Sequence, residues 1–296
     1  MIKISQIHAP VIVIGMHRSG TSVLSRLLSM LGVNMGLRVD DNWESNHTRR
    51  INQFIFRQIN ATWDHVTPFN NLYKSNDHVR QLELLMRSSI NRRFILDHFG
   101  LSDSIAIKPK SGKTWFWGWK DPRNTFTLPF WKAIFPAAKI IHIYRNPVDV
   151  GLSLKTREEL TGVDYENNYK TRFKKIIRYG RIGMSNVNML DAENGCRLWE
   201  QYVSQALEHE KTYGNDVLSI CYEELLADVT SAINIVSAFL EINNPDTYSS
   251  QINAAVKSDN RYKFINSDEG MRIYLAWREN TLFRQLGYPL RLKHVI

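Results

Sequence analysis

The sequence predicts an α/β protein in which helices flank a mostly parallel central sheet. Two observations indicate this fold class. Short apolar runs typical of buried strands recur along the chain, and stretches with helical spacing separate them. The expected strands are Val11–Ile14, Thr114–Trp119, Ile140–Tyr144 and Val217–Cys221. Ligands of such sheets bind beyond the carboxyl ends of the strands, so we expect the functional site there.

The first expected strand runs into a glycine-rich loop and then into a helix. The loop contains Gly15 and Gly20, and the helical pattern covers Val23–Leu31. Glycines permit a tight turn, while the N–H groups and the positive end of the helix dipole favour an anion. The glycines have the Walker A separation, but Thr21 stands where that motif has its lysine. The loop predicts a phosphate site without ordinary ATP chemistry, although packing alone explains many such loops.

Residues 46–100 have helical spacing and few strand signals, so we expect a helical insertion there. The insertion belongs to one expected domain that spans residues 1–296, because a chain of this length can bury a single large core. A closing amphipathic helix is expected over Glu269–Leu286.

A second connection between a strand and a helix carries an arginine. The run Lys139–Tyr144 is of the buried type, Arg145 follows it, and Pro147 suits the first turn of a helix. Ser153 falls in the second turn of that helix. We therefore expect Arg145 and Ser153 to bind one anion together.

These two segments resemble the 3′-phosphoadenosine 5′-phosphosulfate-dependent sulfotransferases, in the bacterial and carbohydrate-type branch of that family. Two further stretches are similar to family segments: Trp117–Arg123, which contains Lys-Asp-Pro, and Cys221–Asp228. The resemblance extends from about residue 10 to about residue 240.

The resemblance implies a P-loop-like sulfotransferase fold, with 3′-phosphoadenosine 5′-phosphosulfate as the cosubstrate and no required metal. It implies that Arg145 and Ser153 bind the 3′-phosphate, and that the first loop cradles the 5′-phosphosulfate. The loop residues are Gly15, His17, Arg18, Ser19, Gly20, Thr21 and Ser22. The helical insertion is then expected to help form the acceptor site.

Sulfuryl transfer needs positive charge where the leaving group becomes negative, and a base that removes the proton of the acceptor. Lys120 is our candidate for the charge on the leaving-group side, because it ends a buried-type strand next to Asp121. Arg18 and the loop N–H groups add to that charge. A structural ion pair with a nearby carboxylate is the alternative role for Lys120.

Glu44 is the leading candidate for the base. Several sulfotransferase branches carry a catalytic glutamate after the first helix, and burial beside Trp43 would raise the pKa of the Glu44 carboxyl toward neutrality. A solvated acidic loop or a helix cap is the alternative explanation of Glu44. His47 is the second candidate for the base, since an imidazole titrates near neutral pH.

The composition describes a globular protein with an anionic partner. There are 38 Lys and Arg residues against 29 Asp and Glu, a net charge of +9. No nucleic-acid-binding signature is present, and a nucleotide with phosphate and sulfate groups accounts equally well for the charge. The basic stretch Lys170–Arg181 suits a solvated helix face, or a surface that guides an acidic ligand. With two cysteines and neither a signal peptide nor a transmembrane segment, we expect a cytoplasmic location.

The sequence thus predicts a sulfotransferase that acts on a hydroxyl, or less readily an amine, of a small-molecule or glycan acceptor. The acceptor stays open among a carbohydrate, a lipid-linked sugar, a polyketide and a protein tyrosine. An ATP-dependent small-molecule kinase is one alternative, disfavoured by the missing Walker lysine and by the pair Arg145 and Ser153. A non-catalytic nucleotide-binding protein is the other.

Overall fold

The computed structural model describes residues 9–37, 39–90, 94, 96–100, 117–167, 186–242 and 260–288. The chain divides into two compact units. The first comprises Met1–Tyr144 with Tyr202–Ser258, and the second comprises Arg145–Gln201 with Asp259–Ile296. The single domain expected from the sequence stays a prediction.

A four-stranded parallel sheet forms the centre of the first unit, which confirms the expected α/β class. Its strands are β1 (Val11–Ile14), β2 (Gly118–Lys120), β3 (Lys139–Tyr144) and β4 (Val217–Cys221), in the order β2-β1-β3-β4. The strands are rich in β-branched residues and largely buried, as expected for a parallel sheet covered on both faces. The start of the second expected strand, residues 114–116, lies outside the described residues.

The register of the sheet brings the ends of neighbouring strands to one edge. Val13 of β1 pairs with Lys120 of β2, and Ile14 pairs with His142 of β3. Lys120 is therefore the last residue of β2 rather than the residue that follows the strand, and it lies beside the point where β1 passes into the glycine loop.

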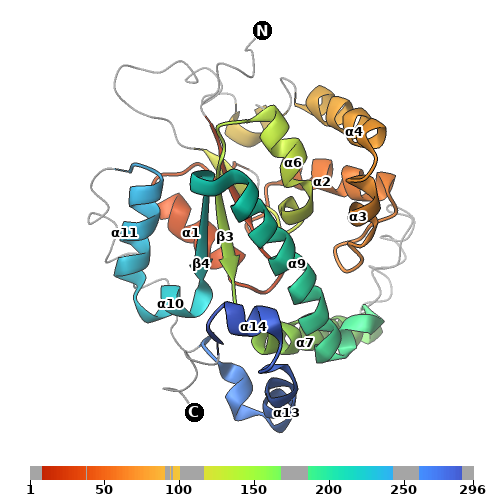
Figure 1. Cartoon of the computed structure of the whole chain (residues 1–296), viewed down its shortest axis with the longest axis vertical. Coiled ribbons are helices and arrows are strands. Elements are labelled where there is room, and N and C mark those ends of the chain that lie inside the picture. Colours follow the sequence, from red (N-terminus) through yellow and green to blue (C-terminus); the bar gives the residue numbers. More distant parts are fainter. Residues whose placement is uncertain are drawn as a thin grey trace. The chain divides into compact units, whose positions relative to one another are not determined.

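Helices α1 (Thr21–Met30), α10 (Tyr222–Ala227) and α11 (Val229–Phe239) pack on one face of the sheet. Leu24, Leu27 and Leu28 recur on one side of α1 and contact the apolar face of β1 and β3. Figure 1 shows α1 and α11 on one side of β3 and β4, with α2 and α6 on the other side. The helix expected over Val23–Leu31 is thus observed, with its first residue two positions earlier.

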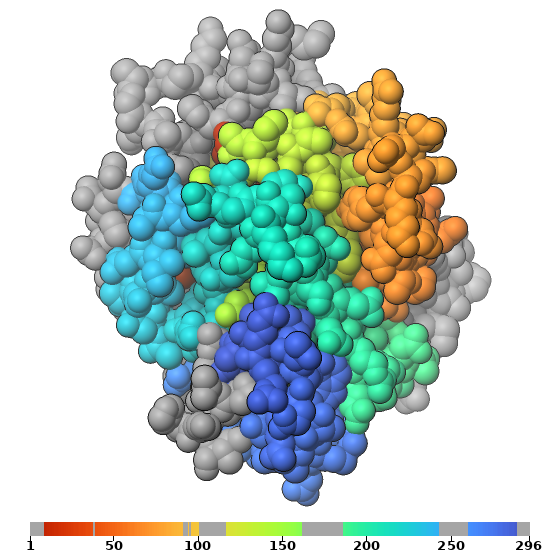
Figure 2. Space-filling model, viewed as in Figure 1, coloured from red at the N-terminus to blue at the C-terminus, as the bar shows by residue number. Residues whose placement is uncertain are grey.

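Residues 46–100 are helical over much of their described part. The helices are α2 (Asn46–Gln58), α3 (Pro68–Leu72) and α4 (Asn76–Ser89). Helix α6 (Asn124–Ile134) follows β2 and contacts β1, α2 and α4. Figure 2 shows α4 in orange beside α6 in yellow-green. Trp117, Trp119 and Trp131 are all buried in the core around α6.

The second unit contains the remaining helices. They are α7 (Pro147–Asn167), the 3-10 helices η2 (Val187–Leu190) and η6 (Lys263–Asn266), α13 (Asp268–Trp277) and α14 (Thr281–Gln285). Helix α9 (Ala192–Tyr213) begins in this unit and ends in the first, where η3 (Gly214–Asp216) leads into β4. Helices α7 and α9 approach closely at Gly151 and Gly195, because a Cβ on Gly195 would lie 2.7 Å from the Cα of Gly151.

The prediction of one closing helix over Glu269–Leu286 is wrong. The structure has two helices there, α13 and α14. Asn280 separates them, since its side chain accepts hydrogen bonds from the N–H groups of Leu282 and Phe283 and so caps a new helix.

Candidate functional site

The glycine loop is held in place by its two glycines. Gly15 has a φ of +136°, and a Cβ there would lie 2.3 Å from the carbonyl oxygen of Ile143. Its N–H donates to the hydroxyl of Thr125 at 3.1 Å. Gly20 has a φ of +91°, and a Cβ there would lie 2.2 Å from the ring of Tyr222. Both positions therefore require glycine.

The start of α1 offers unpaired donors to an anion. Gly20 is the N-cap and has no side chain to satisfy the first turn, and that turn contains no acidic residue. The hydroxyl of Ser19 is buried and has no hydrogen-bond partner in the described part of the chain. Arg18 is exposed and has a φ of 68°. This arrangement suits a phosphate or sulfate group.

The segment at residues 40–44 contacts the first turn of α1 and positions Glu44. The hydroxyl of Ser22 donates to the carbonyl of Asn42 at 2.8 Å. One carboxylate oxygen of Asp40 accepts the N–H groups of Asn42 and Glu44, each at 2.9 Å. Trp43, with a φ of 63°, completes this turn. The turn brings Glu44 into a parallel bridge with Lys120.

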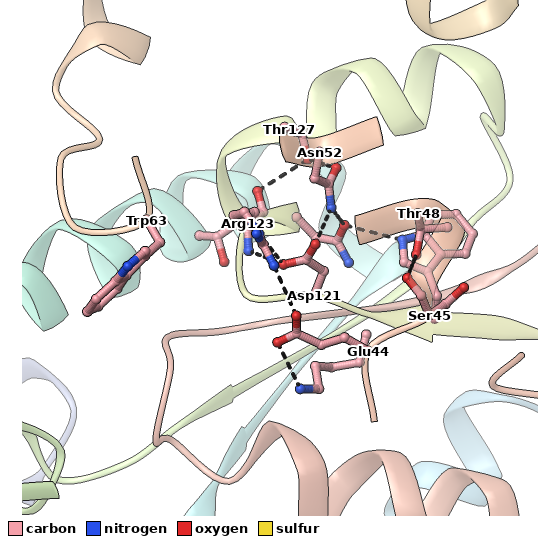
Figure 3. Close-up of polar contacts among 12 residues, drawn as sticks. Glu44, Ser45, Thr48, Asn52, Trp63, Asp121, Arg123 and Thr127 are labelled. Atoms are coloured by element: carbon pink, nitrogen blue, oxygen red, sulfur yellow. Dashed lines mark hydrogen bonds and ion pairs between the residues drawn. The ribbon is translucent and has the colours of Figure 1, made fainter. Parts of the chain in front are cut away.

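Glu44 and Lys120 form a buried ion pair. Their side chains lie 3.4 Å apart, Oε1 to Nζ, and the two residues are 6% and 2% exposed (Figure 3). Burial raises the pKa of Glu44 to about 7; Asp121 also raises it, while Lys120 and Arg123 oppose the rise. Burial lowers the pKa of Lys120, and Glu44 opposes that change. The structural ion pair considered for Lys120 exists, and its partner is the candidate base. Glu44 does not lie in a solvated loop.

Arg123 is a charged neighbour of this ion pair, and the sequence motifs predicted no role for it. Its Nη2 donates to Oε2 of Glu44 at 2.9 Å, and its Nε donates to Oδ1 of Asp121 at 2.8 Å. Its position directly after Lys-Asp-Pro was the signal available in the sequence. Asn52, on α2, donates to Asp121 at 2.9 Å, and no sequence motif marked it.

The second candidate base, His47, lies in a different set of contacts. Its Nδ1 is 3.1 Å from a carboxylate oxygen of Asp97, and its ring contacts Phe94 edge to face. His17 of the glycine loop packs edge to face against Trp63, with ring centroids 5.0 Å apart. Trp63 thus brings the helical segment next to the loop.

Arg145 and Ser153 belong to the second unit. The Nη2 of Arg145 donates to the carbonyl of Asn260 at 2.7 Å and lies 3.4 Å from Oδ2 of Asp149. The other oxygen of Asp149 accepts the N–H of Phe264 at 2.9 Å. Ser153 lies in the second turn of α7. That Arg145 and Ser153 bind one anion together stays a prediction. The basic stretch 170–181 lies outside the described residues.

The sequence matches the model of the sulfotransferase family over residues 10–246. The chain therefore belongs to the sulfotransferase family, and its general activity is sulfuryl transfer. The P-loop-like α/β fold that the resemblance implied agrees with this membership. No curated protein has a significantly similar sequence.

Several solved sulfotransferase structures have a similar fold. The sulfotransferase domain from the curacin biosynthetic pathway is 14% identical, with a TM-score of 0.48 over 91% of this chain and 97% of its own. The sulfotransferase domain of the Synechococcus PCC 7002 olefin synthase is 15% identical, with a TM-score of 0.46 over 93% and 96%. Sulfotransferase STF9 from Mycobacterium avium is 12% identical, with a TM-score of 0.44 over 92% and 76%.

Within the described ranges, no helix has the length and apolar character needed to cross a membrane. The same residues contain no group of three or more His, Cys, Asp and Glu side chains that could hold a metal ion. Cys196 and Cys221 are both buried and form no disulfide.

Proposed function

We propose that this sulfotransferase moves a sulfuryl group from 3′-phosphoadenosine 5′-phosphosulfate to a hydroxyl of a carbohydrate or another small molecule. One observation carries the proposal: the buried pair of Glu44 and Lys120 lies at the sheet edge where the glycine loop begins. A base and a cation thus stand next to an anion site. Sulfuryl transfer needs these three features together.

The residues of the glycine loop fit the phosphosulfate part of the donor. The uncapped start of α1 and the unpaired hydroxyl of buried Ser19 offer hydrogen bonds to anionic oxygens. Arg18 adds a positive charge beside them, and Thr21 and Ser22 occupy the first turn of the helix. We infer that Arg145 and Ser153 bind the 3′-phosphate of the same nucleotide.

When bound, the donor supplies a sulfuryl group on a phosphate leaving group. Glu44 takes the proton of the acceptor hydroxyl, and the acceptor oxygen forms a bond to sulfur. The bond from sulfur to the bridging oxygen breaks, and its electron pair stays on the phosphate. Lys120, Arg18 and the loop N–H groups offset that charge. His47 is the alternative base, and an amine is the alternative acceptor group.

The proposal also covers the acceptor site, the kinase alternative and the location of the protein. We infer that the helical insertion helps to bind the acceptor, because its Trp63 packs against His17 of the loop. A kinase activity is not favoured, since the chain belongs to the sulfotransferase family and has Thr21 in place of the Walker lysine. A cytoplasmic location, inferred from the cysteine count, is part of the proposal.

Calorimetric titration with 3′-phosphoadenosine 5′-phosphate tests the donor assignment. Parallel titrations use adenosine 5′-phosphosulfate and ATP, and the variants are Arg145→Ala and the exposed control Arg284→Ala. We expect strong preference for the 3′-phosphorylated nucleotide, lost in Arg145→Ala and kept in Arg284→Ala. Binding of ATP that is equal or tighter would refute the assignment.

Transfer is then measured with the radiolabelled donor and a panel of sugars, phenols and amines. We expect labelled product with wild-type protein and a loss of at least about 100-fold in Glu44→Gln, since general bases contribute about 100- to 10,000-fold. Nucleotide binding without transfer to any member of a wide panel would favour the non-catalytic alternative.

A further inference from the structure

Arg123 contacts the candidate base and a second carboxylate at once. It is the N-cap residue of α6, three positions after Lys120. Its Nε donates to Oδ1 of Asp121 at 2.8 Å, and its Nη2 donates to Oε2 of Glu44 at 2.9 Å. The guanidinium is planar and rigid, so fixing one of its edges fixes the direction of the other.

Asp121 is itself fully buried and held from two sides. Its Oδ1 accepts the backbone N–H of Arg123 at 2.9 Å in addition to the guanidinium. Its Oδ2 accepts the side-chain amide of Asn52 at 2.9 Å. The Asp121 carboxylate therefore has a single defined orientation from which Arg123 extends.

Asn52 uses both ends of its amide in the buried network. Its Oδ1 accepts the indole N–H of Trp131 at 3.0 Å and the hydroxyl of Thr127 at 2.8 Å. Its Nδ2 also donates to Asn124 at 2.8 Å. A satisfied polar network of this kind is rigid, and Figure 3 shows it extending from Asn52 through Asp121 and Arg123 to Glu44.

The two oxygens of Glu44 are held unequally as a result. Oε2 is 2.9 Å from Arg123, whereas Oε1 is 3.4 Å from Lys120. The buried cluster comprises two carboxyl groups and two cationic groups: Glu44, Asp121, Lys120 and Arg123. Burial acts to lower the pKa of Arg123, but Asp121 and Glu44 outweigh it and raise that pKa, so Arg123 stays charged.

We propose that Arg123, anchored by Asp121, is a positioning residue that holds Oε2 of Glu44 and leaves Oε1 to receive the acceptor proton. This inference rests on the proposed function, in which Glu44 is the base. When Lys120 engages the leaving group, Arg123 is the cation that stays on the Glu44 carboxylate. It thereby keeps that carboxylate in place.

The titration of Glu44 tests this inference without an acceptor. Protein labelled with ¹³C at the glutamate carboxyls is titrated by NMR, and the Glu44 signal is assigned by its loss in Glu44→Gln. We expect a wild-type midpoint near a pKa of about 7. Arg123→Gln should raise it by about 1 unit or more, because it removes a nearby positive charge. The exposed control Arg284→Gln should leave it unchanged.

The lysine variant separates charge from geometry. Arg123→Lys keeps the positive charge but cannot bridge both carboxylates, so the midpoint should stay near the wild-type value. Hydrolysis of 3′-phosphoadenosine 5′-phosphosulfate, with water as the acceptor, should still fall about tenfold or more in kcat in both variants, as expected for misplaced catalytic groups. The Kd for 3′-phosphoadenosine 5′-phosphate should not change. If Arg123→Gln does not fold, the lysine variant carries the test.

The outcomes distinguish this inference from the proposed function. Failure of the wild-type protein to bind 3′-phosphoadenosine 5′-phosphate would refute the proposed function. Normal nucleotide binding, together with an unchanged Glu44 midpoint in Arg123→Gln or wild-type kcat in Arg123→Lys, would overturn the role of Arg123 alone.

Discussion

Neutralising Glu44 should change how the stability of the protein depends on pH. Folding raises the pKa of Glu44 from 4.5 to about 7, chiefly through burial. Between these values the folded chain keeps a proton that the unfolded chain has released. The free energy of unfolding therefore falls as the pH rises through this window. Glu44→Gln is neutral at every pH and should not show this loss.

The size of the effect follows from the two pKa values. A rise from 4.5 to about 7 corresponds to about 3 kcal/mol once both values are passed, at 1.36 kcal/mol for each pKa unit. Between about pH 5 and about pH 8, the expected loss in the free energy of unfolding is about 2 to 3 kcal/mol. It is smaller than the full value because part of the unfolded-state titration lies below pH 5.

Urea unfolding at several pH values between 5 and 8 measures the effect. Titrations of groups away from Glu44 affect wild type and variant alike, so the difference between them reports Glu44 together with Lys120, whose pKa Glu44 raises. As the pH rises, the free energy of unfolding of wild type should fall by about 2 to 3 kcal/mol relative to that of Glu44→Gln. Glu83→Gln, at an exposed ion pair, is the matched control and should show no such trend. A difference between wild type and Glu44→Gln that is independent of pH would refute the reasoning.

Three further substitutions test close backbone packing and buried polar contacts by urea unfolding. Gly20→Ala should destabilise the protein by more than about 2 kcal/mol and weaken nucleotide binding, because the strained φ adds to a clash with the Tyr222 ring. Asn52→Leu should cost several kcal/mol, at about 1 to 3 kcal/mol for each buried partner left unpaired. Gly195→Ala should destabilise through contact with Gly151, despite the higher helix propensity of alanine.

A second glycine separates the two effects at Gly20. Gly32 has a φ of +89°, close to the +91° of Gly20, but a Cβ there would meet nothing within 4 Å. Gly32→Ala should therefore show only the backbone cost, about 1 kcal/mol or slightly more. Equal losses in Gly20→Ala and Gly32→Ala would contradict the role assigned to the Tyr222 ring. A stabilised Gly195→Ala, or an Asn52→Leu variant as stable as wild type, would contradict the other two predictions.

Local patterns were sufficient to predict most of the sheet. Val11–Ile14, Lys139–Tyr144 and Val217–Cys221 are short apolar runs between polar segments, and each is a strand in the structure. The glycine loop was equally clear, because only glycine suits the backbone at Gly15 and Gly20. The break near Asn280 was missed because helical spacing continues on both sides of the capping residue.

By itself the sequence determined the α/β class, the glycine loop after β1 and the sulfotransferase family, and it offered Glu44 and Lys120 as candidates. These depend on signals carried by residues close together in the chain, such as periodicity, glycine spacing and short motifs. Only the tertiary structure decided that Glu44 is buried against Lys120 and that Arg123 joins Glu44 to Asp121. The two contacts to Glu44 join residues more than 70 positions apart, and strand register and desolvation determine them.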